Sequence, residues 1–168
     1  MSAGRECGAC TACCEGWLNA DINGVEVKPG KPCGNLCASG CGIYEQRPKD
    51  PCQDFRCAWL QEDSPLPDHL RPDQCGAIVM LDRNWHGWQT IRAMPVGENI
   101  PEPTLDWLKQ YAQQSGRPLI FSAIRRTESS LERTPETGFG PPAFVEAVRL
   151  SITPADIYMG PGSKKAAD

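Results

Sequence analysis

The cysteines constrain this chain more than any other feature of its sequence. All ten lie within the first 75 of 168 residues, and four of them fall in the stretch CGACTACC, residues 7–14. No apolar run near the amino terminus resembles a secretion signal, so we expect a cytoplasmic protein whose thiols stay reduced. This compartment disfavours a disulfide framework, and inert buried thiols would not cluster in this way. The cluster therefore indicates metal binding through thiolates.

Charge and hydropathy narrow the possible partners. The formal net charge of −4 comes from the first 75 residues, where eleven acidic residues outnumber seven basic ones. Nucleic-acid-binding surfaces are basic, so we expect no nucleic-acid partner. No apolar run approaches the ~20 residues of a membrane span, so we expect no membrane partner either. The expected partners are a metal ion and, secondarily, another protein.

The distribution of proline and glycine predicts an α+β fold in two regions. Residues 1–75 are rich in both, which leaves room only for short elements such as a strand at 25–28 and a helical turn before Pro48. A loop-rich, cysteine-rich half of this kind buries little apolar area, so we expect metal to staple it. It should pack on a small sheet-plus-helix half at 76–160, followed by a flexible tail at 161–168.

The second region has the clearer secondary-structure signals. Residues 76–82 and 88–94 predict two strands joined by a hairpin, with Trp85 and Trp88 packed on the two sides of the sheet.

A helix and a further strand follow the predicted hairpin. Residues 104–116 predict a helix that Thr104 caps and Gly116 ends. Residues 117–124 predict another strand, and the apolar segment 141–153 is compatible with either a strand or a helix.

CGACTACC, together with KPCGNLCASGCGIYEQRPKDPCQDFRCAWL at residues 31–60, is similar to the CxxCxxCC family of zinc- or iron-chelating domains. The resemblance covers roughly residues 7–60. It implies a metal site of eight cysteines: Cys7, Cys10, Cys13, Cys14, Cys33, Cys41, Cys52 and Cys57. Cys37 is an additional cysteine within the pattern, and Cys75 lies outside it. A similar segment occurs in a flagellin lysine methylase that uses an iron–sulfur cluster, which slightly favours iron–sulfur over Zn²⁺ as the cofactor.

The spacing leaves the number and grouping of metal centres open. Cys7, Cys10 and Cys13 follow one another at two-residue gaps, as in the run that wraps [4Fe–4S] clusters in ferredoxins, but here Cys14 comes next. A zinc site would instead draw a cysteine pair from each of two knuckles. Eight ligands suit two four-ligand sites or one larger cluster.

No motif in the sequence identifies a reaction. Nucleotide-binding, zinc-peptidase and serine-hydrolase signatures are absent, so the catalytic residues are unknown and enzymatic activity is left open. Tyr44, Glu45 and Arg47 are candidates for tuning a metal site through charge or hydrogen bonds, and His69 or His86 could replace a thiol. The leading hypothesis is a protein that chelates iron or zinc through eight cysteines. The alternative is a zinc-stabilised protein-interaction module without a catalytic role.

Overall fold

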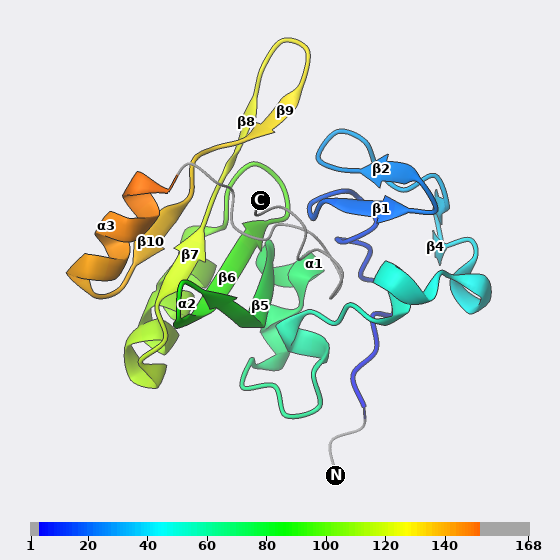
Figure 1. Ribbon diagram of the computed structural model, residues 1–168. Coiled ribbons are helices and arrows are strands. Elements are labelled where there is room, and N and C mark those ends of the chain that lie inside the picture. Colours follow the sequence, from blue (N-terminus) through cyan, green and yellow to red (C-terminus); the bar gives the residue numbers. More distant parts are fainter. Residues whose placement is uncertain (1–3, 152–168) are drawn as a thin grey trace.

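The structure is a computed structural model that describes residues 4–151, so the predicted tail at 161–168 lies outside the described residues. The chain combines helices and strands, as predicted. Figure 1 shows a four-stranded sheet with the short elements of the amino-terminal half beside it. No helix within residues 4–151 is long and apolar enough to cross a membrane.

The sheet contains the predicted hairpin. Its strand order is β10–β7–β6–β5. The strands are β5 (Ala77–Trp85), β6 (Trp88–Pro95), β7 (Leu119–Phe121) and β10 (Thr137–Phe139). β5 and β6 are antiparallel and are joined by a turn of two residues, whereas β7 runs parallel to β6 and antiparallel to β10. A parallel neighbour needs a crossover connection, which here is the predicted helix.

Helix α2 (Glu102–Ser115) makes this crossover. It begins before Thr104, so the predicted cap is wrong. Thr104 is buried within the first turn, and its hydroxyl donates a hydrogen bond to the Cys75 carbonyl at 2.7 Å. The predicted end is confirmed, because Gly116 follows the last helical residue in the left-handed conformation that favours glycine.

Helix α3 (Pro142–Leu150) shows that the ambiguous apolar segment is helical. Its Phe144 is fully buried and meets Trp85 and Trp88 edge-on, with ring centroids 5.6 and 5.5 Å away. The expectation that these tryptophans pack on opposite sides of the sheet is therefore wrong. They pair directly across the hairpin, and paired residues of antiparallel strands project to the same face.

The amino-terminal half consists of short elements, as its composition predicts. The expected strand is β2 (Val25–Val27), and it pairs with β1 (Ala20–Ile22), which the sequence did not predict. The expected helical turn before Pro48 is η1 (Tyr44–Gln46). The other elements are β3 (Leu36–Cys37), β4 (Gly40–Cys41), η2 (Lys49–Gln53), η3 (Ala58–Leu60), η4 (Asp68–Leu70) and α1 (Pro72–Cys75).

One cluster of buried side chains runs through both halves of the chain. Leu18 and Val27 of the amino-terminal half belong to it, as do Ile78, Met94 and Leu108 of the sheet and α2. All five are completely buried. The two halves therefore share a single hydrophobic core.

A half-buried arginine, Arg133, adds a polar connection between the halves. The predicted strand at 117–124 is divided, because β7 is followed by a separate hairpin of β8 (Ile124–Arg126) and β9 (Leu131–Arg133). From the end of β9, the Arg133 guanidinium donates to the Trp17 carbonyl at 2.5 Å and to the Asn19 side chain at 3.2 Å. Burial lowers the pKa of Arg133 to about 10, which still leaves it charged at neutral pH.

Gly76 joins the two halves, and its replacement tests how closely they pack. Its φ is +74°, and a Cβ there would lie 2.6 Å from the Pro101 ring. We expect Gly76→Ala to lower the free energy of unfolding by ~2–4 kcal/mol, through backbone strain and the clash. Gly116→Ala is the matched control, because its φ is +66° but no atom lies within 4 Å of the added Cβ. It should cost only about 1 kcal/mol in urea denaturation. Equal losses would show that the Pro101 contact contributes nothing.

Candidate metal centre

The eight cysteines of the predicted site surround one cavity of about 120 Å³. They come from five separate segments of the sequence, and folding brings them together around the same cavity. The cysteines that line the cavity are Cys7, Cys10, Cys13, Cys14, Cys33, Cys41, Cys52 and Cys57. Cys37 and Cys75, the two cysteines outside the predicted set, are not part of the lining.

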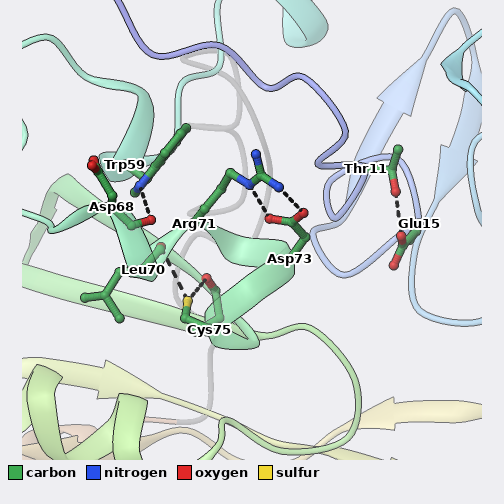
Figure 2. A network of polar contacts seen from close by, with 9 residues as sticks. Thr11, Glu15, Trp59, Asp68, Leu70, Arg71, Asp73 and Cys75 are labelled. Carbon is green, nitrogen blue, oxygen red and sulfur yellow. Dashed lines mark hydrogen bonds and ion pairs between the residues drawn. The ribbon is translucent and has the colours of Figure 1, made fainter. Parts of the chain in front are cut away.

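Tight turns shape the first part of the wall. The Cys10 amide donates to the Cys7 carbonyl at 2.8 Å, and the Glu15 amide donates to the Thr11 carbonyl at 3.0 Å. The Glu15 carboxylate accepts a hydrogen bond from the Thr11 hydroxyl at 2.6 Å (Figure 2). It also accepts one from the Trp17 indole at 2.9 Å. Glu15 therefore stabilises the loop that carries the first four cysteines, and it does not line the cavity.

Four further segments complete the wall. The Cys33 amide donates to the Cys14 carbonyl at 2.8 Å, which fixes Cys33 beside the first loop. The β3–β4 hairpin then places Cys41 opposite Leu36. Cys52 lies in η2, and the buried Cys57 precedes η3.

Cys75 has a structural role at the end of α1. Its buried thiol donates to the carbonyls of Leu70 and Ala77 at 3.4 Å each; Figure 2 shows the thiol contact with Leu70. These contacts close the turn that leads from the amino-terminal half into β5.

Two arginines supply the charged side chains of the lining, apart from the cysteines themselves. Arg71 forms a two-fold ion pair with Asp73, with N–O distances of 2.6 and 2.7 Å (Figure 2). Arg47 lies over the Tyr44 ring at 3.9 Å, and its buried Nε has no hydrogen-bond partner. Tyr44 also lines the cavity, whereas the candidate Glu45 is exposed and does not. No sequence signal pointed to Arg71, because this residue lies outside the cysteine pattern.

Burial makes the cavity thiols difficult to ionise. It raises the pKa of Cys14 to about 12 and that of Cys57 to about 11, and it raises the pKa of Cys13 well above its usual value. Charge on the neighbouring sulfurs raises the pKa of each of these thiols further. In contrast, Arg47 lowers the pKa of Cys7, although burial outweighs this effect. Eight thiolates around this cavity would therefore need a cation among them.

The thiols surround the cavity without converging on one point. Within residues 4–151, no group of three or more His, Cys, Asp and Glu side chains is placed to hold a metal ion. Four thiolates around one zinc ion, at Zn–S distances of about 2.3 Å, would lie only ~4 Å from one another. The histidine candidates do not contribute, because His69 and His86 are exposed and absent from the lining.

No protein-family model matches the chain, and neither the curated proteins nor the solved structures yielded a match. The resemblance to the CxxCxxCC family therefore rests on the cysteine pattern alone.

Cys37 differs from the cavity cysteines in exposure and reactivity. It lies on the β3–β4 hairpin, fully exposed, and a hydrogen bond with the Ser39 hydroxyl at 3.3 Å lowers its pKa. We expect limiting iodoacetamide at pH 7.5 to alkylate Cys37 of the metal-free, reduced protein at least tenfold faster than Cys13 or Cys57, because only the thiolate reacts. Peptide mass spectrometry measures the rates. Ser39→Ala should slow the labelling of Cys37 and leave the other two unchanged, whereas equal rates at all three positions would contradict the burial of the cavity thiols.

Proposed function

We propose that the chain is a metal-binding protein that holds iron, as an iron–sulfur cluster, in its cysteine-lined cavity. One observation carries the proposal: a single cavity collects the eight cysteines of the predicted pattern and excludes the other two. Chance burial of apolar thiols gives no reason for this division, because Cys75 is as buried as Cys57.

The donor set supports a thiophilic metal. Among the described residues, the lining contains no aspartate, glutamate or histidine side chain, so sulfur is the main ligand type available. Soft thiolate donors select Zn²⁺, Cu(I) and iron–sulfur clusters over Mg²⁺ and Ca²⁺.

The size of the cavity favours a cluster over a bare ion. A single water molecule needs ~10–15 Å³ of such space, whereas this cavity offers about 120 Å³. In a [4Fe–4S] cluster each thiolate bonds a different iron atom, so the ligands surround an inorganic core instead of converging on one ion. The placement of the thiols around the cavity agrees with this requirement.

The remaining lining residues suit a redox centre. Ile22, Phe55 and Trp59 form an apolar part of the wall that limits water, which tunes the potential of a cluster. Arg47 and Arg71 place positive charge beside the thiolates. When bound, an iron–sulfur cluster would supply one-electron chemistry, while the eight cysteines hold it and the two arginines offset part of its negative charge.

Anaerobic purification tests this proposal. We expect a brown protein that contains iron and acid-labile sulfide in equal amounts and loses its colour with dithionite. Cys57→Ala should lose at least half of the iron, whereas Cys75→Ala, at an equally buried position, should keep it despite a lower stability. A colourless wild-type protein that contains zinc would favour the interaction module. A metal-free wild type, or a fully loaded Cys57→Ala variant, would overturn metal binding through these cysteines.

Arg47 provides a second test, because its charge reaches the thiols from the cavity wall. A hydrogen bond with Tyr44 is the main cause that raises the pKa of Arg47, and charge on Cys7 and Cys41 raises it further. We expect Arg47→Ala to weaken metal retention against a chelator by about tenfold, a typical effect of residues that tune a metal site. Arg56→Ala is the control, because Arg56 also lowers the pKa of Cys7 but is exposed and does not line the cavity. Equal chelation rates in the two variants would contradict a role for Arg47.

A further inference from the structure

The segment at the start of the cavity wall, residues 4–9, has few backbone contacts. We call this segment the strap. It contains no helix or strand (Figure 1). Among the described residues, its backbone makes one hydrogen bond, in which the Cys7 carbonyl accepts from the Cys10 amide of the same turn. Backbone hydrogen bonds therefore do not attach the strap to the rest of the fold.

Arg5 makes this attachment with its side chain. The guanidinium donates to the carbonyls of Trp59 and Leu66, each at 2.9 Å, and forms an ion pair with the Asp68 carboxylate at 2.7 Å. It also lies over the Trp59 ring, with its central carbon 4.8 Å from the ring centroid. The strap is thereby tied to η3, to η4 and to the loop between them.

The residues that receive Arg5 are held firmly in place. Trp59 and Leu66 are buried in the core that both halves share, and η3 contacts β5 of the sheet. The Trp59 indole donates to the Asp68 carbonyl at 3.1 Å, which joins η3 to η4 (Figure 2). In contrast, no side chain of residues 4–9 belongs to this core. The strap therefore depends on Arg5 more than its docking site does.

The strap forms one part of the cavity wall. Its Cys7 and Gly8 line the cavity, as do Cys57 and Trp59 at the place where Arg5 docks. The φ of Gly8 is +53°, in the left-handed region that favours glycine, so the chain turns sharply as it passes the cavity. Displacing the strap would remove this part of the wall and expose the cavity to solvent.

We propose that the strap is the movable wall of the cavity and that Arg5 is the latch that holds it closed. Opening breaks the guanidinium contacts but exposes little apolar surface, because most residues of the strap are already exposed. Local openings of this kind need less free energy than global unfolding. A metal or cluster would enter and leave the cavity on this side, at a rate that Arg5 sets.

Thiol labelling of the metal-free, reduced protein tests the latch without any assumption about metal. Cys57 and Cys75 are equally buried, but only Cys57 lines the cavity. In Arg5→Ala, we expect iodoacetamide to label Cys57 about tenfold faster than in the wild type, the effect of losing roughly one hydrogen bond to a charged group. The rate at Cys75 should change far less. Equal acceleration of both thiols, or none at Cys57, would overturn the latch.

Two matched variants separate the latch from general stability and from surface charge. Arg133→Ala removes another half-buried arginine that donates to a backbone carbonyl of the first half, away from the cavity lining. It should leave the ratio of the Cys57 and Cys75 labelling rates unchanged. Asp68→Asn removes only an exposed ion pair, so it should alter the Cys57 rate by about twofold or less. An effect as large as that of Arg5→Ala would overturn the assignment of the latch to the two carbonyl bonds.

The wild-type protein offers a test that does not depend on the folding of any variant. In dilute urea, the labelling rate of Cys57 should stay nearly constant, because opening the strap exposes little surface. The labelling rate of Cys75 should rise with urea, because this thiol lies in the shared core and borders no part of the cavity. Equal urea dependence at the two positions would show that the cavity opens only with the whole fold, and would overturn the movable wall.

Metal release distinguishes the latch from the proposed function. If the wild type binds iron or zinc, Arg5→Ala should bind the same amount and release it to a chelator about tenfold faster, since every ligand is still present. Unchanged release from Arg5→Ala would contradict control by the latch. If the wild type binds neither metal, the proposed function is wrong, and the labelling of Cys57 still decides whether Arg5 closes the cavity.

Discussion

The amino-terminal half of this protein is arranged around eight thiols that line one buried cavity. These thiols resist ionisation because they have left water and because a thiolate there would be repelled by other thiolates beside it. Arg47 and Arg71 are the charged partners that the wall provides, and two guanidinium groups do not balance eight thiolates. The cationic centre proposed above would offset the remaining charge, and the folding of this half and the binding of metal would then be linked equilibria.

The sheet provides the scaffold of the molecule, and the cysteine-bearing segments pack against it. Their own elements are too short to form a separate core, so Leu18 and Val27 are buried in the same cluster as the strands. Arg133 and Thr104 reach from the second half to backbone carbonyls of the first. This is the usual division of labour in which a packed scaffold positions loops that carry the chemistry.

The sequence predicted those features that depend on local pattern. Hydrophobic runs predicted β5 and β6, and the cysteine pattern selected the eight residues that share the cavity. The sequence-based predictions failed where contacts between residues distant in the chain determine the local structure. Thr104 hydrogen-bonds a carbonyl distant in sequence instead of capping its own helix, and Trp85 and Trp88 gather on one face because Phe144 arrives there from α3.

Cys57 is the last of the cavity cysteines along the chain, and it leads directly into η3 and the shared core. The entropic cost of closing a loop grows with its length, and the longest connection in the cavity wall runs from the turn that carries Cys7 to Cys57. Because η3 contacts β5, the packing that docks η3 on the sheet also brings Cys57 to the cavity. Closing the cavity and joining the two halves are therefore coupled in the folded chain.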